Sequence, residues 1–480
     1  MDVTPFFGHI IDGKEIESAD GSRFVTVNPW TRESWAEVAL GGALEADLAI
    51  AAARRAFDEG PWPRMGFGTR QELLHRLGDL MESHTDELAA ADSRDMGKPL
   101  AQCRHDVARA ALNFRFFADH AKMAVADTLP MDTGHHAYVR FEPAGVVGPI
   151  APWNFALMLE TWKVAPALAW GNTVVLKPAE DTPASAAILG RLAIEAGFPD
   201  GVLNVVHGYG PDSVGEALTT DPRVDRITFT GETGTGRIIA AAAAKNLTPV
   251  SLELGGKNAN IVFADAELDN AVDWSIQSIF RNAGQICLSG SRLYVQRPIF
   301  DEFLARFVAK AEAMKIGDPL DPTTEFGPLA TEEHFTKVKG YLDTVEAEGG
   351  RIATGDLGEG WVVRPTVLVD MPLDSTQVRE EIFGPVVVVH PFDTEDEVVA
   401  LANGTPYGLD AQLFTENLSR AHRVSARLDV GTVWVNCSFI RDLRAPFGGV
   451  GSSGIGREGG NFSREFFTEP KAVIMQVDSA

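Results

Sequence analysis

The chain has 480 residues, of which 45% are hydrophobic and 23% are charged. At roughly 100–200 residues per domain, this length predicts two to four domains, and the composition excludes a disordered, collagenous or coiled-coil chain. The formal net charge of -25 disfavours nucleic acid and membrane surfaces as partners, because an acidic surface repels phosphate.

The chain contains three cysteines, Cys103, Cys287 and Cys437. They are too few for a disulfide framework and lack metal-ligand spacing, so no metal is expected. The N-terminus lacks the basic and apolar segments of a signal peptide, and no apolar run of about 18 residues could cross a bilayer. We therefore expect a cytoplasmic protein with no membrane partner.

The first third of the chain predicts helices followed by a hairpin. Residues 43–57 are Ala-rich with early acids and late arginines, which suits the helix dipole. Residues 71–91 and 107–125 have the periodicity of longer amphipathic helices. Residues 127–142 contain turn formers and an alternating segment, which predicts a β-hairpin.

Short apolar segments then alternate with helix-like segments. The first block of predicted strands covers residues 145–150, 173–176, 202–206 and 226–229. Its predicted helices cover residues 162–169, 185–196 and 213–219. A second block has predicted strands at 259–263, 291–295, 362–369, 386–392 and 431–436. This order predicts an α/β fold with parallel sheets covered by helices.

Cys287 is a candidate nucleophile because it lies between Gly284 and Gly290. Glycines let a ligand approach the backbone closely. Cys103 and Cys437 fit the usual environment of a cysteine, a small buried hydrophobe. The local sequence leaves that interpretation open for Cys287 as well.

Two other residues have suitable chemistry. Glu253 lies between leucines and before two glycines; desolvation would raise its pKa, as a general base near neutral pH requires. Pairing with Lys257 is the alternative. Asn154 follows a predicted strand within Pro152-Trp153-Asn154, and its amide can donate to an oxyanion or serve only a turn.

Segment 231–236 has the strand, glycine loop and helix order of a pyrophosphate site, with the helix predicted from Arg237. Its G-x-x-G-x-G spacing differs from the dinucleotide fingerprint and is weak evidence. Lys177 and Glu180 follow the predicted strand 173–176. An acid there can accept hydrogen bonds from ribose hydroxyls and repel a 2′-phosphate, although a surface turn is the alternative.

In this order, these segments resemble the NAD(P)-dependent aldehyde dehydrogenase family from Asn28 to about Phe467. The matching segments are Pro152–Phe155, Leu176–Glu180, Phe229–Gly231, Leu252–Lys257, Gly284–Cys287, Glu381–Pro385 and Pro446–Gly449. The resemblance implies a Rossmann-like NAD-binding domain (1–126 and 143–252) and an α/β catalytic domain (253–445). It also implies a small β oligomerisation extension (127–142 and 467–480) and a homodimer or homotetramer.

The resemblance also implies site roles. Cys287 would be the nucleophile, Glu253 the base and Asn154 an oxyanion donor, with Lys163 supporting Asn154 from behind. NAD, rather than NADP, would be the cofactor. Its contacts would be Pro152, Trp153, Lys177, Glu180, Gly210, Phe229, Thr230, Gly231, Leu254, Glu381 and Phe383. Glu232 departs from the serine common in relatives, so the phosphate contacts are not fixed by the resemblance.

Trp162 and Phe447 would line the aldehyde tunnel. Arg109, Arg441 and Arg444 resemble features of the 2-hydroxymuconic and 5-carboxymethyl-2-hydroxymuconic semialdehyde dehydrogenase subgroup. We expect oxidation of a carboxylate-bearing semialdehyde to the free acid with reduction of NAD, through a Cys287 thioester that is hydrolysed with Glu253 as base. The arginines could instead pair with the chain's many carboxylates. A cofactor-independent cysteine hydrolase and an idle structural protein on the same fold are the alternative functions.

Overall fold

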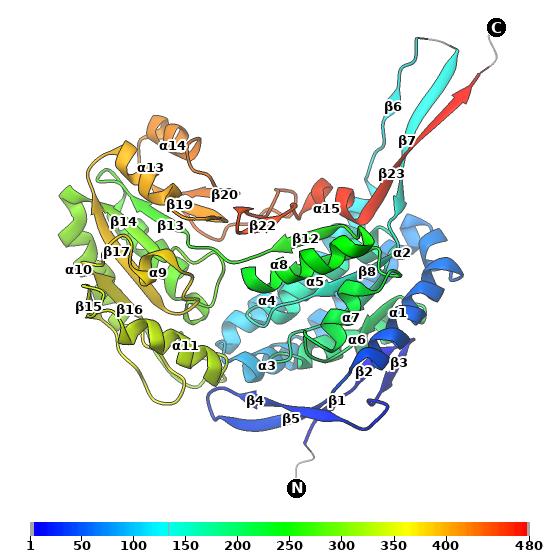
Figure 1. The fold of residues 1–480 in the computed structure, drawn as a ribbon, viewed down its shortest axis with the longest axis horizontal. Helices are drawn as coiled ribbons and strands as arrows, with labels where there is room; N and C mark the ends of the chain where they lie inside the picture. The colour runs from blue at the N-terminus through cyan, green and yellow to red at the C-terminus, as the bar shows by residue number, and fades with distance from the viewer. Residues whose placement is uncertain (1–3, 133, 478–480) are drawn as a thin grey trace.

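The computed structural model describes residues 4–132 and 134–477. Two large sheets, each covered by helices, form two lobes, and a narrow β extension projects from one of them (Figure 1). Within the described residues, no helix is long and apolar enough to span a bilayer.

The first lobe is built on an eight-stranded sheet of order β22-β12-β11-β8-β9-β10-β2-β3. Its strands are β2 (His9–Ile11), β3 (Lys14–Ile16), β8 (Val146–Ile150), β9 (Thr173–Leu176), β10 (Leu203–Val205), β11 (Arg226–Thr230), β12 (Val250–Glu253) and β22 (Gly454–Ile455). The five strands from β12 to β10 are parallel. Chain order runs outward from β8 in both directions, and in such sheets ligands bind at the carboxyl ends of the strands where the order reverses.

Helices cover both faces of this sheet. The helices are α1 (Ala43–Asp58), α2 (Phe67–Ser83), α3 (Thr85–Met96), α4 (Leu100–Lys122), α5 (Ala156–Ala169), α6 (Ala184–Ala196), α7 (Val214–Thr220), α8 (Thr233–Ala243) and α15 (Gly460–Phe467). Helices α1, α7 and α8 contact one another and the sheet, whereas α5 and α6 contact the sheet and carry α2, α3 and α4 behind them. A small sheet of β1 (Phe6–Phe7), β5 (Glu33–Ala39) and β4 (Arg23–Asn28) lies beside this lobe.

The second lobe is built on a seven-stranded sheet of order β15-β16-β17-β14-β13-β19-β20. Its strands are β13 (Ala259–Val262), β14 (Arg292–Gln296), β15 (Arg351–Thr354), β16 (Thr366–Val369), β17 (Val386–Phe392), β19 (Asp410–Phe414) and β20 (Thr432–Val435). Its helices are α9 (Leu268–Phe280), α10 (Phe300–Glu312), α11 (Glu332–Asp343), α12 (Thr376–Arg379), α13 (Glu395–Asn403) and α14 (Leu418–Ser425). A two-stranded ladder joins β18 (Tyr407–Gly408) to β21 (Val450–Gly451).

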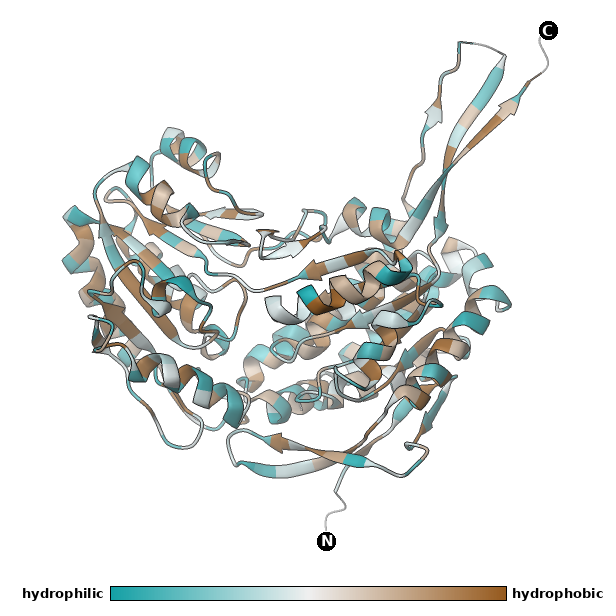
Figure 2. Ribbon diagram, viewed as in Figure 1, coloured by the Kyte–Doolittle hydropathy of each residue, from teal (hydrophilic) through white to brown (hydrophobic). Residues whose placement is uncertain are grey.

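The core of the second lobe follows from its sequence. The run Val386-Val387-Val388-Val389 in β17 is buried throughout, because a parallel strand with helices on both faces has no solvent side. β-branched side chains fit such a strand well. Figure 2 shows the same arrangement, with hydrophobic strands inside and polar residues on the outer helix faces.

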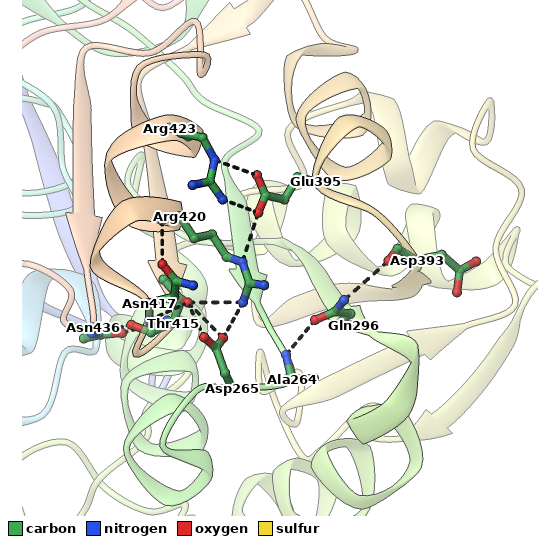
Figure 3. Close-up of polar contacts among 10 residues, drawn as sticks. All are labelled: Ala264, Asp265, Gln296, Asp393, Glu395, Thr415, Asn417, Arg420, Arg423 and Asn436. Atoms are coloured by element: carbon green, nitrogen blue, oxygen red, sulfur yellow. Dashed lines mark hydrogen bonds and ion pairs between the residues drawn. The ribbon is translucent and has the colours of Figure 1, made fainter.

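Charged side chains fasten α13 and α14 to the end of this sheet (Figure 3). The Arg420 guanidinium donates to Asp265 at 2.6 Å and to Glu395 at 3.1 Å. Arg423 donates to Glu395 as well. The Arg420 guanidinium also lies 4.5 Å from the centre of the Phe263 ring, so this arginine is both stacked and paired.

The extension contains β6 (Thr128–Leu129), β7 (His135–Pro143) and β23 (Thr468–Gln476) in one antiparallel sheet. The predicted hairpin over 127–142 is therefore present, and the C-terminal strand adds to it across nine residue pairs. Leu129, Ile474 and Met475 are exposed there. Residues 133 and 478–480 of the predicted extension lie outside the described residues.

Several predicted elements differ from the structure. The single helix predicted over 71–91 is two helices, α2 and α3, separated at His84. Helix α8 begins at Thr233, so Gly234 and Gly236 are helical and not loop residues. The strand predicted over 362–369 begins only at Thr366, since Pro365 has no N–H to donate to a ladder.

The predicted domain boundaries stay predictions. Strand β12 ends at Glu253 in the first sheet and β13 begins at Ala259 in the second. Strand β22 pairs with β12, so the segment after residue 445 returns to the first lobe.

Candidate active site

Cys287 follows α9 and the short 3-10 helix η3 (Arg281–Gly284). Asn282, Ala283 and Gly284 all have positive φ angles, 51°, 52° and 70°. A Cβ at position 284 would lie 2.2 Å from the Gly384 carbonyl oxygen, so only glycine fits there. The Asn258 side chain donates to the Cys287 carbonyl at 2.6 Å. This strained turn and its hydrogen bond fix the position of the thiol.

Cys287 lines two neighbouring cavities. The smaller, of about 150 Å³, is also lined by Glu253, Trp162, Phe447, Arg109 and Arg441. The larger, of about 260 Å³, is also lined by Pro152, Trp153, Asn154, Thr230, Gly231, Leu254, Glu381 and Phe383. The structure thus brings four of the five predicted substrate residues to one side of the thiol and seven of the eleven predicted cofactor residues to the other.

Four predicted cofactor residues lie outside that lining. The Lys177 ammonium is 3.1 Å from the Glu180 carboxylate, just after β9. Phe229 is buried in β11, beneath Gly231. Gly210 lies in the loop between β10 and α7, where its carbonyl accepts from the Glu216 N–H.

Glu253 is the last residue of β12 and is 4% exposed. Among the described residues, neither oxygen of its carboxylate has a hydrogen-bond partner. Burial, and next the nearby Glu458 carboxylate, raise the pKa of Glu253 well above that of an ordinary carboxyl group. A buried carboxylate without donors, next to a cysteine, has the properties of a general base.

Asn154 lies between β8 and α5. Its side-chain amide donates to the Gln285 carbonyl at 2.9 Å, and its own carbonyl accepts from Asn282 at 2.9 Å. These bonds tie the amide to the turn that carries Cys287. An amide nitrogen has two N–H groups, so one stays available to an oxyanion.

Lys163 does not support Asn154 directly, contrary to the prediction. Its ammonium is buried and donates to Glu458 at 2.7 Å and to Thr228 at 3.0 Å. Glu458 also lines the smaller cavity. It was not predicted, because it lies in a glycine-rich segment with no motif around it. Lys163 instead neutralises the carboxylate that faces Glu253.

The guanidinium of Arg441 lies between two aromatic rings. Its centre is 3.8 Å from the Phe447 ring centre and 5.2 Å from that of Trp162. Arg109 approaches the same Trp162 ring at 5.7 Å and donates to Asn113 at 3.3 Å. Within residues 4–132 and 134–477, no carboxylate forms an ion pair with either arginine. Burial, and then Arg109, lower the pKa of Arg441 to about 10, so it stays charged at neutral pH.

Arg444 must be removed from the predicted substrate set. It is exposed and forms a bidentate pair with Asp442, with a closest distance of 2.6 Å. It does not line the cavity that contains Cys287. Only Leu443 lies between this arginine and its acid in the chain, so Arg444 is satisfied by local pairing.

The larger cavity has groups that could hold part of a dinucleotide. One Glu381 carboxylate oxygen accepts from the Gly256 N–H at 2.9 Å, which leaves the other for a ribose hydroxyl. Burial raises the pKa of Glu381 to about 7. Phe383 has a φ of 60°, packs edge-on against Trp153 and is held by His334, whose ring contacts its carbonyl at 2.7 Å.

The N-terminus of α8 follows the carboxyl end of β11, where backbone N–H groups suit phosphate. Glu232 is the N-cap of this helix but makes no side-chain cap bond there. Its carboxylate lies 3.8 Å from the Lys337 ammonium. The departure from serine at position 232 is thus accommodated by an ion pair at the edge of the cavity.

Comparison with known proteins agrees with this geometry. Residues 16–473 match the model of the aldehyde dehydrogenase family, and the chain belongs to that family. It is 49% identical to a 2-hydroxymuconic semialdehyde dehydrogenase of Pseudomonas sp. (strain CF600), over 98% of this chain and 99% of the relative. It is 44% identical to a mitochondrial benzaldehyde dehydrogenase of Antirrhinum majus, over 97% and 88% of the two chains.

Among solved structures, an NAD+ complex of the aldehyde dehydrogenase of Bacillus cereus matches with a TM-score of 0.96 and 40% identity, covering 98% of this chain and 97% of that one. The predicted family, α/β fold and enzyme class are confirmed. The two curated relatives are named for different aldehydes at similar identity, so the substrate must be argued from the site.

Proposed function

We propose that this chain oxidises a semialdehyde of 2-hydroxymuconic type, which carries a carboxylate remote from its aldehyde, to the free acid with NAD as the oxidant. The observation that carries the proposal is the presence of two arginines, Arg109 and Arg441, in the cavity of Cys287 without a carboxylate partner among the described residues.

Charge arithmetic supports an anionic substrate. The protein as a whole carries a net charge of -25, yet Arg109 and Arg441 line this small cavity without an ion pair to a described carboxylate. Two of the carboxyl groups that also line it, Glu458 and Asp106, are paired with Lys163 and Lys98. Burying unpaired guanidinium charges is costly unless a counter-charge arrives. A planar guanidinium holds a carboxylate with two parallel hydrogen bonds, so a carboxylate of the substrate would be the missing partner.

The chain's own residues perform the acyl transfer. The Cys287 sulfur attacks the aldehyde carbon, and the free Asn154 N–H and the Cys287 backbone N–H bind the oxyanion. Each such donor is worth about 3–4 kcal/mol. Glu381 and Phe383 in the larger cavity would hold NAD, which would supply the hydride acceptor needed to take the thiohemiacetal to the thioester. Glu253 then takes a proton from water, which hydrolyses the thioester and frees the acid.

The charges around Glu253 suit this second step. Glu458 opposes ionisation of Glu253, whereas Lys163 and Arg441 favour it. Lys163 is fixed to Glu458 at 2.7 Å, so the Glu253 carboxyl lies beside a neutralised pair. Burial and Glu458 raise the pKa of Glu253, so a larger share of its carboxyl group is protonated at a given pH than in an ordinary glutamate.

The test is substrate discrimination by matched aldehydes. Hexanal and 6-oxohexanoate differ only in a terminal methyl or carboxylate group, and 2-hydroxymuconic semialdehyde is the third substrate. Arg109→Met and Arg441→Met should each lower kcat/KM about 10- to 100-fold for the two acids, because a hydrogen bond to a charged group contributes about 1.5–3 kcal/mol. Hexanal should lose far less.

Arg444→Met is the matched control, since Arg444 is exposed and satisfied by Asp442. It should leave all three rates unchanged. If the wild-type enzyme prefers hexanal, or if the Arg109 and Arg441 variants affect hexanal and the acids equally, the semialdehyde assignment fails.

The extension supports a proposal of self-association. Its exposed apolar side chains, Leu129, Ile474 and Met475, would be covered in a homodimer or homotetramer. Sedimentation of wild type against Ile474→Glu tests this, and a monomeric wild type would contradict it.

The free state of all three cysteines fits the expected cytoplasmic location.

A further inference from the structure

Strand β19 carries two polar side chains on a buried face. Asp410 and Gln412 are two residues apart, so they lie on the same side of the strand, and they are 1% and 0% exposed. In the same sheet, the first four residues of β17 are all valine. A buried polar group costs free energy unless it is hydrogen-bonded, so a polar face at this place indicates a specific set of partners.

The partners of Gln412 lie in and around the segment that follows Cys287. Its amide nitrogen donates to the Leu288 carbonyl at 3.3 Å and to the Asp410 carboxylate at 2.6 Å. Its amide oxygen accepts from the Ser278 hydroxyl at 2.8 Å. The oxygen of that hydroxyl accepts from the Gly290 N–H at 3.1 Å. A flipped Gln412 amide would point its oxygen at two other acceptors, so the orientation of this side chain is fixed.

Asn258 holds the other carbonyls of the segment. Its amide nitrogen donates to the Cys287 carbonyl at 2.6 Å and to the Ser289 carbonyl at 3.1 Å. Its amide oxygen accepts from the backbone N–H of Asp410 at 3.3 Å. The carbonyls of residues 287–289 and the N–H of residue 290 are therefore all bonded to side chains. Those side chains, Asn258, Ser278 and Gln412, form a cradle for residues 287–290.

Gly290 has a different role from the one that its sequence suggests. A Cβ at this position would lie 2.2 Å from the Gln412 amide oxygen and 2.9 Å from the Ser278 hydroxyl. The glycine therefore lets the protein's own cradle reach the backbone, whereas the sequence favoured the approach of a ligand. All three cradle side chains are buried, so bulk water does not compete for these bonds.

We propose that the cradle positions the nucleophile, and that Gln412 and Ser278 are positioning residues of the reaction. The bonds to residues 287–290 fix the Cys287 backbone, and so the place where its sulfur meets the aldehyde carbon. A misplacement of about 1 Å at a reacting atom can cost about 100-fold in rate. The proposal rests on Cys287 being the nucleophile of the proposed function, but it does not depend on which aldehyde is oxidised.

The test is the rate of the first NADH formation in the purified full-length enzyme, measured by stopped flow with saturating NAD and hexanal. Ser278→Ala and Gln412→Met should each slow this step about 10- to 100-fold. The KM for hexanal and the affinity for NAD should stay within about twofold of wild type, because neither side chain lines the two cavities of Cys287. The rate with 6-oxohexanoate should fall by the same factor.

Ser275→Ala is the matched control. Ser275 lies on α9 one turn before Ser278, is equally buried and accepts from the Asn260 amide at 2.9 Å. Its variant loses the same atom and also leaves a buried amide unpaired. Within the described residues, however, Ser275 bonds no group of residues 287–290. Urea unfolding should show a loss of stability in both serine variants, whereas Ser275→Ala should keep the wild-type rate of NADH formation.

Wild-type rates in both Ser278→Ala and Gln412→Met, or an equal loss of rate in Ser275→Ala, would overturn the proposal. A loss confined to KM would also overturn it. If Gln412→Met does not fold, Ser278→Ala alone decides.

The outcome separates the cradle from the substrate assignment. If both cradle variants slow NADH formation while wild type prefers hexanal to 6-oxohexanoate, the cradle stands and the semialdehyde assignment fails. If the cradle variants keep the wild-type rate while Arg109→Met and Arg441→Met lose the preference for the acid, the cradle fails and the semialdehyde assignment stands. Turnover in Cys287→Ala would remove the nucleophile on which both rest.

Discussion

Several arginines of this chain lie over aromatic rings, and two of them, Arg420 and Arg441, differ in what else they touch. Arg420 lies over Phe263 and is paired with Asp265 and Glu395 (Figure 3). Arg441 lies over Phe447 and has no ion pair within the part of the chain that the structure describes. The aromatic support is alike, so the difference lies in the counter-charge. Arg441 lies in the cavity of the candidate nucleophile and has no counter-charge there, and this difference from Arg420 indicates a role in the reaction.

The same contrast holds for carboxylates. Glu395 accepts from both Arg420 and Arg423, whereas Glu253 accepts from no described donor. Paired groups contribute to stability, and uncompensated groups are a cost that persists where function requires it. Substitutions on each side of this contrast should therefore change different observables.

The largest expected effect comes from removing the sulfur of Cys287. Cys287→Ala should abolish aldehyde oxidation, because no other described cysteine lines either cavity. NAD binding should survive, since the cofactor contacts lie on other residues. Steady-state NADH release and NAD titration by fluorescence measure the two effects. Turnover above a contamination control would contradict the assignment.

Glu253→Gln should slow thioester hydrolysis about 10²- to 10⁴-fold, the usual contribution of a general base. The first release of NADH should then be faster than hydrolysis. Stopped-flow mixing should show a burst of about one NADH per site followed by slow turnover. Loss of the burst would mean that Glu253 acts before hydrolysis.

In wild type, deacylation should rise with pH. The pKa of Glu253 is raised, so its base form is scarce at low pH and accumulates as pH increases through that pKa. This pH dependence should disappear in Glu253→Gln. A deacylation rate that falls with rising pH would exclude this role.

Arg420→Met and Arg441→Met should have different effects on stability. Arg420→Met removes two ion pairs that are only partly exposed and should lower the free energy of unfolding by about 1–2 kcal/mol. Arg441→Met removes an uncompensated charge and should leave the stability unchanged or higher. Urea unfolding followed by circular dichroism measures both variants, and equal destabilisation would break the comparison.

Glu180 is an intermediate case, since it is paired with Lys177 but its side chain is 40% exposed. Its carboxylate should bind ribose hydroxyls and repel a 2′-phosphate. Wild type should therefore prefer NAD over NADP, and Glu180→Ser should narrow that preference about tenfold. Equal kcat/KM ratios for the two cofactors in wild type and variant would remove Glu180 from this role.

The sequence was most informative where function depends on local segments. Cys287, Glu253 and Asn154 were each predicted as candidates from their neighbours, and all three line the two cavities. The alternating strands predicted both sheets. Partners that are distant in the chain could not be read in this way. Lys163 and Glu458 are 295 positions apart, so nothing in the local sequence indicates their pairing, and the family resemblance assigns Lys163 to Asn154.

Arg441 and Arg444 show the limit most clearly, because they lie in one four-residue segment. Sequence resemblance offered both as substrate residues. The fold directs Arg441 toward Trp162 and Phe447, while Arg444 turns back to Asp442. The break at His84 between α2 and α3 was missed for a related reason, since no proline or glycine marks it.

The placement of Glu253 and Cys287 makes the reaction depend on the docking of the two lobes. The base ends a strand of the first sheet, and the nucleophile lies on the connection from α9 to β14 in the second. A cut in the chain between residues 253 and 259 would leave the base on one fragment and the sulfur on the other. Thioester hydrolysis that is recovered on mixing the two fragments would then measure how accurately the two lobes reassemble. The turnover rate would depend on the relative position of Glu253 and Cys287.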